Sequence, residues 1–247
     1  MIDIDIDIDL VIFDKDGTLI DVHHYWCGMI ELRAKKLSQD YIGVSLQKDV
    51  EQELMLNMGI DLTTRKMKTS GPVGIKPREF IVQIAHQTMH KYNQEITVSQ
   101  VSSTFNLIDE YSKEHLNTLV KLLPGVEQLL ITLKQKKIKI AIATTDLTQR
   151  AKLAMDGVGL KHYFDDIAGA DLVKNAKPSP DLVHYLCDKM SVDTSKTVVI
   201  GDSIVDLEMA VSANVKFIGV KTGLYSSKFS ANSCILVDDL TYIEKLL

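Results

Sequence analysis

The feature that most constrains the fold is a series of short, almost wholly apolar segments that alternate with helical patterns. Four of these segments indicate buried strands, at residues 10–13, 138–143, 197–200 and 215–220. A weaker fifth candidate spans residues 166–168. Near-continuous apolar runs are typical of parallel sheets that are covered on both faces. Apolar residues at helical spacing lie between them, in residues 126–136, 181–190 and 206–213. This alternation predicts an α/β fold with a doubly wound, parallel, Rossmann-like sheet.

Residues 22–120 follow a different pattern. Apolar side chains recur there at spacings of three and four, and no convincing strand interrupts them. We therefore expect a helical domain over 22–120, inserted into an α/β core domain that is formed by residues 1–21 and 121–247.

Composition and charge exclude several classes of function. The net charge is −5, and nucleic acid is bound by clustered cations, so we expect no nucleic-acid partner. The three cysteines are far apart and form no CxxC pair, which indicates core thiols in a reducing compartment. No apolar run approaches the roughly 20 residues that span a bilayer, and no secretory signal pattern opens the chain. These observations predict a cytoplasmic protein without a membrane partner.

The chain begins with an alternation of Ile and Asp. Such alternation is typical of a half-exposed strand, but Asp is a poor strand former. We expect these aspartates to carry no chemistry and to solubilise the start of the first strand: Asp3, Asp5, Asp7 and Asp9.

Polar residues follow the predicted strands at the points where the strands end. They are Asp14 and Asp16 after the first strand, Thr144 and Thr145 after the second, Lys177 beyond the weak strand, and Asp202 and Asp206 after residues 197–200. Gly17 allows the chain to turn sharply directly after Asp16. Ligands of open parallel sheets bind at the carboxyl ends of the strands, so we expect these side chains to converge. Clustered carboxylates require a cation or a proton between them, and all-oxygen ligands suit Mg²⁺. A lysine and a threonine hydroxyl beside them would bind phosphoryl oxygens.

Four segments in this order, DKDGTL, TT, KPSP and GDSIVD, resemble the four motifs of the haloacid dehalogenase (HAD)-like hydrolase superfamily. The long interval between Asp14 and Thr144 leaves room for the helical cap domain that such proteins carry after the first motif. The cap position and the KPSP segment most resemble the phosphoglycolate phosphatase and β-phosphoglucomutase branch.

The resemblance implies a Mg²⁺-dependent phosphatase that hydrolyses a small phosphorylated metabolite through an aspartyl-phosphate on Asp14. Asp16 would protonate the leaving group and then activate water, and Lys177 would offset the charge on the phosphoryl group. The expected phosphate or substrate contacts are Thr144, Thr145, Gly17 and His23. The expected Mg²⁺ ligands are Asp14, Asp16 through its backbone carbonyl, Asp202 and Asp206, the last of which could instead hold Lys177 or cap a helix. Lys15 is assigned no role.

Other readings of the same motifs stay open. The first is a phosphomutase of the same fold. A phosphonate-cleaving hydrolase would need a cap lysine that forms a Schiff base, for which Lys35, Lys36 and Lys48 are available. A non-catalytic binding protein is disfavoured by the intact set of charged motif residues, and a dehalogenase by Asp16. The sequence predicts neither the substrate nor the oligomeric state.

Overall fold

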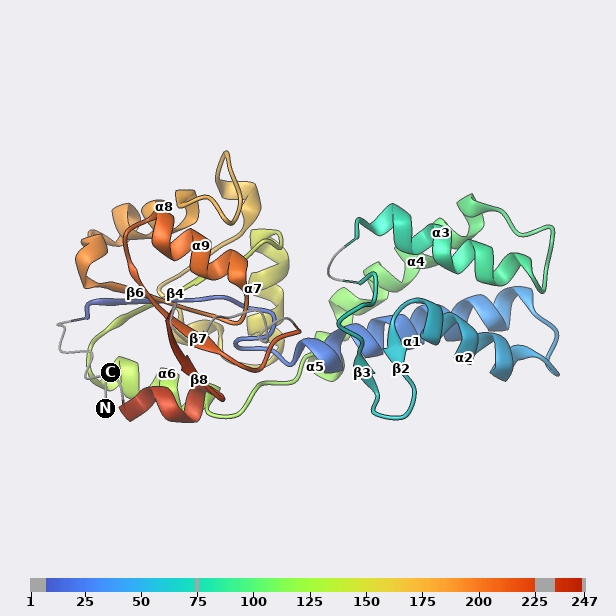
Figure 1. Ribbon diagram of the computed structural model, residues 1–247, viewed down its shortest axis with the longest axis horizontal. Coiled ribbons are helices and arrows are strands. Elements are labelled where there is room, and N and C mark those ends of the chain that lie inside the picture. The colour runs from blue at the N-terminus through green and yellow to red at the C-terminus, as the bar shows by residue number, and fades with distance from the viewer. Residues whose placement is uncertain (1–7, 74–75, 225–233, 246–247) are drawn as a thin grey trace. The chain divides into compact units, whose positions relative to one another are not determined.

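The computed structural model describes residues 8–73, 76–224 and 234–245 (Figure 1). They divide into two compact units. The first, here called the sheet unit, contains the chain up to Val22 and from Val120 onward, and the second, here called the helical unit, is His23–Leu119. None of the described helices is both long and apolar enough to cross a membrane.

The sheet unit is built on six parallel strands in the order β5-β4-β1-β6-β7-β8. Their bounds are β1 (Leu10–Phe13), β4 (Lys139–Ala143), β5 (Asp166–Ala168), β6 (Thr197–Gly201), β7 (Lys216–Val220) and β8 (Ile235–Val237). The predicted parallel α/β sheet is therefore confirmed. The edge strand β8 was not predicted, because its three residues are only half-buried and give a weak apolar signal.

Strand β1 and its two neighbours, β4 and β6, end side by side. Phe13 is in register with Ile142 of β4 and Ile200 of β6. The next residue, Asp14, still donates its backbone N–H to the Ile200 carbonyl at 2.8 Å. Polar residues that follow these strands consequently emerge along one edge of the sheet.

The Ile-Asp repeat enters the described structure at its last residues. The backbone of Asp9 pairs with Lys196 on one side and with Lys139 on the other, so the parallel pairing begins before β1. The Asp9 carboxylate lies 3.2 Å from Lys196 Nζ, at the surface. Asp3, Asp5 and Asp7 lie outside the described residues.

Helices cover both faces of the sheet, with α8 and α9 on one side and α6 on the other (Figure 1). The helical elements are α6 (Val126–Gln135), α7 (Thr148–Gly157), α8 (Asp181–Met190), α9 (Ile204–Ser212) and the short 3₁₀ turns η1 (Lys161–Tyr163), η2 (Ala170–Leu172), η3 (Thr194–Lys196) and η5 (Leu240–Lys245). This arrangement is the reason that the strands are apolar on both faces.

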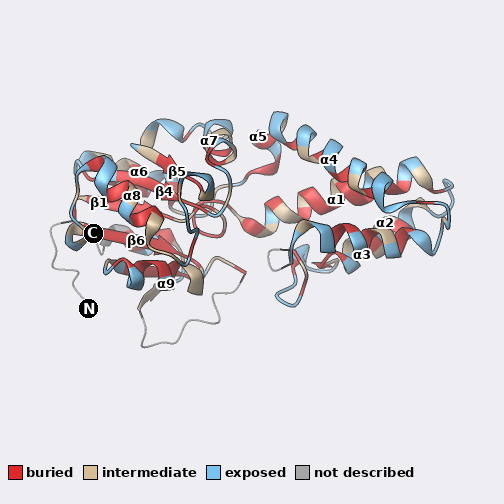
Figure 2. Cartoon of the chain, turned by 90° about the horizontal axis from the view of Figure 1, so that it is seen from above, coloured by how far each residue is buried: buried red, intermediate tan, exposed pale blue. Residues whose placement is uncertain are grey.

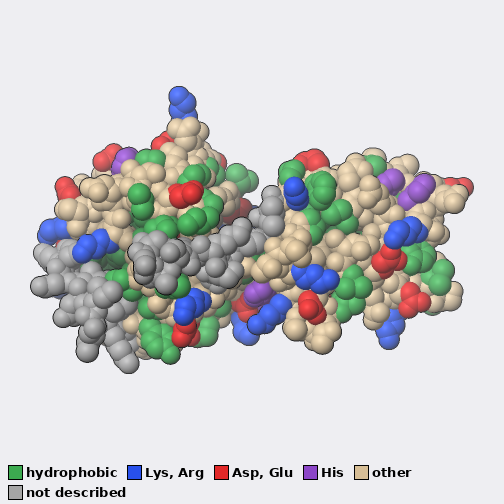
Figure 3. All heavy atoms as spheres, viewed as in Figure 1, with side chains coloured by type: hydrophobic (Ala, Val, Ile, Leu, Met, Phe, Trp, Pro, Cys, Tyr) green, Lys and Arg blue, Asp and Glu red, His purple; other side chains and the backbone are tan. Residues whose placement is uncertain are grey.

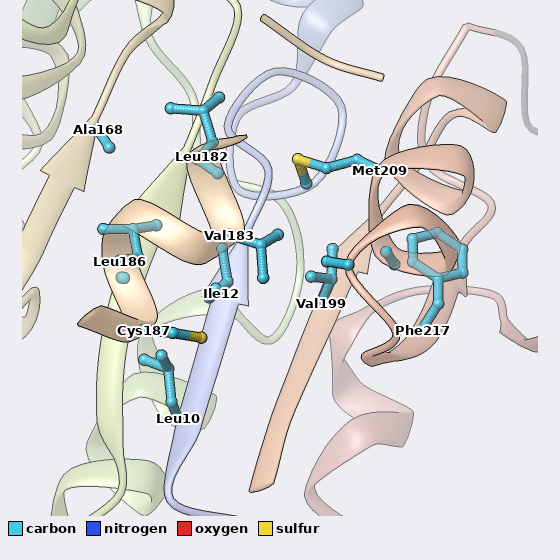
Figure 4. Close-up of a cluster of buried hydrophobic side chains, with 14 of the residues drawn as sticks. Leu10, Ile12, Ala168, Leu182, Val183, Leu186, Cys187, Val199, Met209 and Phe217 are labelled. Atoms are coloured by element: carbon cyan, nitrogen blue, oxygen red, sulfur yellow. The ribbon is translucent and has the colours of Figure 1, made fainter. Parts of the chain in front are cut away.

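The core between the sheet and helices α8 and α9 is continuous (Figures 2 and 4). Leu182, Val183 and Leu186 of α8 are fully buried against Leu10 and Ile12 of β1. Complete burial of one such aliphatic side chain stabilises a fold by about 1.5–3 kcal/mol. This packing fixes the strand ends, and it thereby fixes the residues that follow them.

The helical unit contains α1 (Val22–Tyr41), whose first residue still belongs to the sheet unit, together with α2 (Gln47–Asn57), α3 (Arg78–His90), α4 (Val98–Glu114) and α5 (Leu116–Leu119). The helical character predicted for this region is confirmed. The expectation that it holds no strand was wrong, because β2 (Ile60–Asp61) and β3 (Lys66–Met67) form a small antiparallel pair. Each strand has only two residues, which is too short for a recognisable period.

Charged side chains are interspersed on the surface of each unit in the view of Figure 3, with Lys and Arg beside Asp and Glu. Exposed ion pairs such as Lys221 with Asp238, at 2.8 Å, are examples. Surface pairs of this kind contribute little to stability, about 0–1 kcal/mol each.

Candidate active site

Asp14 and Lys177 form the centre of the candidate site. Asp14 is the first residue beyond β1, and its side chain is 13% exposed. Lys177 comes from the segment between β5 and α8, and its side chain is 2% exposed. The Lys177 Nζ atom lies 2.7 Å from Asp14 Oδ1, so residues far apart in the sequence meet as predicted.

Asp206 connects this pair to helix α9. Its Oδ1 accepts a hydrogen bond from Lys177 Nζ at 2.6 Å. Its Oδ2 accepts from the Ser203 hydroxyl at 2.6 Å and from the Ser203 backbone N–H at 3.2 Å, which completes a capping box at the start of α9. Both carboxylate oxygens of Asp206 are thus occupied, one by helix capping and the other by Lys177.

Three carboxylates converge at this point. Asp14, Asp202 and Asp206 each offer an oxygen, and these oxygens all lie within 4.8 Å of one another. Burial raises the pKa of Asp14 to about 6 against the opposing effect of Lys177. Burial, together with the nearby Asp14 carboxylate, also raises the pKa of Asp202 well above its ordinary value.

This excess of negative charge suits a hard cation. Lys177 is the charged partner of Asp14 and Asp206, and Asp202 adds a third carboxylate, which is buried. Carboxylate oxygens at such spacing are the donors that Mg²⁺ prefers. Asp14 and Asp202 therefore fit a magnesium site, whereas the oxygens of Asp206 are already engaged.

Two glycines give the Asp202 carboxylate its space. Gly17 has a φ of +96°, and a Cβ atom there would lie 2.6 Å from Asp202 Oδ2. A Cβ on Gly223, in the segment after β7, would also collide with this carboxylate. The Thr222 hydroxyl donates to the Gly17 carbonyl at 2.5 Å and joins the two segments. Sequence reasoning missed Thr222 and Gly223, although they too follow a buried strand.

The remaining motif residues of the sheet unit, Thr144, Thr145, Gly17 and Asp16, also follow β4 and β1, and they differ in burial and in hydrogen-bond partners. Thr144 is buried, and its Oγ1 accepts the Asp146 N–H at 3.1 Å, whereas Thr145 is exposed. The N–H of Gly17 donates to the Ile20 carbonyl at 2.8 Å, which makes a tight turn. The carboxylate of Asp16 is one third exposed, and its Oδ2 lies 2.7 Å from Lys15 Nζ.

His23 belongs to the helical unit. Its Nδ1 accepts a hydrogen bond from the Met67 N–H at 3.1 Å, which connects the start of α1 to β3. This contact shows that the side chain helps to hold the β2–β3 pair against α1.

Comparisons with known proteins find one matching family and several relatives. A family profile described as haloacid dehalogenase-like hydrolase matches residues 8–214. A probable phosphatase IndB from Dickeya dadantii is 26% identical over 220 residues, which cover 88% of this chain and 83% of that protein. A phosphoglycolate phosphatase from Haemophilus influenzae is 30% identical over 129 residues, which cover 52% of this chain but only 56% of that protein.

The fold has counterparts among solved structures. The crystal structure of a predicted phosphoglycolate phosphatase from Haemophilus somnus superimposes with a TM-score of 0.69 at 23% sequence identity. The superposition covers 98% of this chain and 99% of that structure. At this level of identity the likeness shows a shared fold.

Proposed function

This chain belongs to the haloacid dehalogenase-like hydrolases, and we propose that it is a Mg²⁺-dependent phosphatase that hydrolyses a small phosphomonoester through an aspartyl-phosphate. The observation that carries the proposal is the contact of the partly exposed Asp14 carboxylate with the buried Lys177, beside Asp202. A carboxylate nucleophile needs both an open face and a neighbouring cation to offset the charge of the incoming phosphoryl group.

In the first half of the reaction, an Asp14 oxygen attacks phosphorus. The new oxygen–phosphorus bond forms as the ester bond breaks, and the leaving oxygen takes a proton from Asp16. Lys177 is held by Asp206 at 2.6 Å, so its charge remains beside Asp14 throughout the transfer.

In the second half, water attacks the phosphorus of the aspartyl-phosphate and gives a proton to Asp16. This step releases inorganic phosphate and restores the Asp14 carboxylate. Such phosphoryl transfer depends mainly on positioning and charge stabilisation.

Asp14, Asp202 and the backbone carbonyl of Asp16 would hold Mg²⁺. When bound, the ion would neutralise the carboxylate cluster and polarise the phosphoryl oxygens. Asp206 serves this site by holding Lys177, since its second oxygen caps α9.

Of the two threonines, we assign the phosphoryl contact to Thr144. Its oxygen accepts from the Asp146 N–H, which leaves the hydroxyl hydrogen available to donate to a phosphoryl oxygen. The exposed Thr145 is the second choice. Gly17 contributes the turn and the space for Asp202. The assignment of His23 to the substrate stays a prediction from the sequence.

The substrate that we propose is a small phosphorylated metabolite of the phosphoglycolate type. The support for this class is the phosphatase names of relatives, among them the phosphoglycolate phosphatase from Haemophilus influenzae, together with the four strand-end motifs. The absence of a nucleic-acid or membrane partner and the cytoplasmic location remain predictions from composition.

The test measures phosphate release from p-nitrophenyl phosphate and from a panel of small phosphomonoesters, with and without Mg²⁺. We expect Asp14→Asn to abolish release, and Asp9→Asn, which changes a surface carboxylate, to leave it unchanged. Activity that survives Asp14→Asn would overturn the proposal. Conversion of one sugar phosphate into its isomer, without net release of phosphate, would identify a phosphomutase instead.

A further inference from the structure

We propose that Lys15 positions the Asp16 carboxylate, and that Asp146 fixes Lys15 for this purpose. The proposal rests on the proposed function, because it gives Lys15 a part in the proton transfers assigned to Asp16. Lys15 stands between the two motif aspartates in the sequence. Its Nζ lies 2.7 Å from Asp16 Oδ2 and 3.2 Å from Asp146 Oδ2.

Because Lys15 is buried, its ammonium group needs carboxylate partners. Its side chain is 5% exposed, whereas those of Asp16 and Asp146 are 33% and 22% exposed. A buried ammonium group is costly unless carboxylates compensate it, so Lys15 has a strong preference for the position between these two acids. The Lys15 carbonyl also accepts the N–H groups of Leu19 and Ile20, each at 3.0 Å, which fixes its backbone within the turn.

Asp146 is a rigid support for this arrangement. Its Oδ1 accepts the Leu147 N–H at 2.8 Å, and its own N–H donates to Thr144 Oγ1 at 3.1 Å. Its carbonyl accepts the Ala170 N–H at 3.0 Å. The segment after β4 therefore holds Asp146, and Asp146 holds the Lys15 ammonium group. Lys15 in turn holds Asp16, the more exposed of the two carboxylates.

The site thus contains two buried lysines with separate partners. Lys177 contacts Asp14 and Asp206, and Lys15 contacts Asp16 and Asp146. Each proposed catalytic carboxylate thus has its own lysine: Lys177 for Asp14, which attacks phosphorus, and Lys15 for Asp16, which donates a proton to the leaving oxygen. A side chain that is one third exposed would otherwise sample several rotamers, and a proton donor acts efficiently only within hydrogen-bond reach.

The consequence is a dependence on the leaving group. Phosphate esters of weakly acidic alcohols need a proton at the leaving oxygen, whereas p-nitrophenol leaves without much help. We expect Lys15→Met to lower kcat for phenyl phosphate about tenfold or more, with a smaller effect on p-nitrophenyl phosphate. KM should change little, because the phosphoryl group is held by other residues. Lys15→Arg retains the cation and should restore most of the kcat for phenyl phosphate.

Asp146→Asn and Lys134→Met complete the experiment. Asp146→Asn should give a weaker form of the same leaving-group dependence, and it covers the case in which Lys15→Met fails to fold. Lys134→Met removes a lysine that contacts Asp165 at 2.8 Å outside the site, and it should affect neither substrate. Circular dichroism and thermal unfolding establish that each variant is folded.

Two results would overturn the proposal. One is an equal loss of kcat with both substrates in folded Lys15→Met or Asp146→Asn, which is the signature of a structural role only. The other is a Lys15→Arg variant that is as impaired on phenyl phosphate as Lys15→Met. Failure of the proposed function is distinct, since it would appear as activity that survives Asp14→Asn.

Discussion

Lys177 Nζ lies 2.6 Å from Asp206 Oδ1, and both side chains are only 2% exposed. The other Asp206 oxygen accepts the Ser203 hydroxyl at the start of α9. Lys177 in turn reaches Asp14. The position of Asp14, the proposed nucleophile after β1, therefore depends on the amino terminus of α9, which follows β6. The fold and the site thus depend on the same contacts.

Removal of Lys177 should damage stability as well as activity. Lys177→Met leaves Asp14 and Asp206 buried without their cation, and breaking a buried ion pair on one side costs about 3–5 kcal/mol. We expect a loss of that order in the free energy of unfolding, measured by urea titration without Mg²⁺, together with loss of phosphatase activity. Lys134→Met, which removes a more exposed ion pair, should cost about 1 kcal/mol or less. A Lys177→Met variant as stable as the Lys134→Met control would contradict this account of the charge cluster.

Mg²⁺ should stabilise the folded protein through Asp202. A ligand that binds only the native state at 100 times its Kd adds about 2.7 kcal/mol to the free energy of unfolding. We expect Tm to rise with Mg²⁺ concentration in the unmodified protein, and this rise to be largely lost in Asp202→Asn. The matched control is Asp188→Asn, an exposed position on α8. Differential scanning fluorimetry needs no substrate, and equal Tm shifts in the two variants would exclude Asp202 as a ligand.

The sheet and the position of the site could be predicted from sequence because the strands are buried on both faces. Continuous apolar runs marked β1, β4, β6 and β7, and the polar residues directly after them converge at one edge. Lys177, from the segment between β5 and α8, reaches the same edge and contacts Asp14 across 163 positions of the chain. Strand β8 and the β2–β3 pair were missed because a short, partly exposed strand has no distinctive period.

The contacts of Lys15 could not be predicted, for a different reason. Its partner Asp146 comes from another strand end, and no local pattern indicates that an ammonium group will be buried between them. The need for glycine at position 223 could not be predicted either. It arises because the Asp202 carboxylate lies where a Cβ atom of residue 223 would be, and this depends on the spacing of the two backbone segments. Such details depend on three-dimensional distances, which a motif does not encode.

Stability should fall in acid partly through Asp171. Hydrogen bonds from the Thr148 backbone N–H at 2.7 Å and the Thr148 hydroxyl at 2.8 Å lower the pKa of Asp171. A depressed folded pKa gives stability that is present above the unfolded pKa and is lost as pH falls through the folded pKa. We expect the difference in unfolding free energy between the unmodified protein and Asp171→Asn to be largest near neutral pH. It should shrink below about pH 4, near the unfolded pKa of Asp. A difference that stays constant in urea titrations across this range would contradict the assignment.

Gly17 should tolerate no side chain, and Gly159 provides the matched control. Both have positive φ angles, +96° and +73°, so alanine brings backbone strain at either position. Only Gly17 faces a neighbour, since its Cβ would lie 2.6 Å from Asp202 Oδ2, while nothing lies within 4 Å at Gly159. The strain alone should cost about 1 kcal/mol in each variant. Gly17→Ala should in addition displace Asp202, and we therefore expect weaker Mg²⁺ binding and a lower kcat in this variant only. Isothermal titration with Mg²⁺ and phosphate-release assays compare the two. Equal Mg²⁺ affinity in Gly17→Ala and Gly159→Ala would show that the close approach of Gly17 to Asp202 has no part in forming the site.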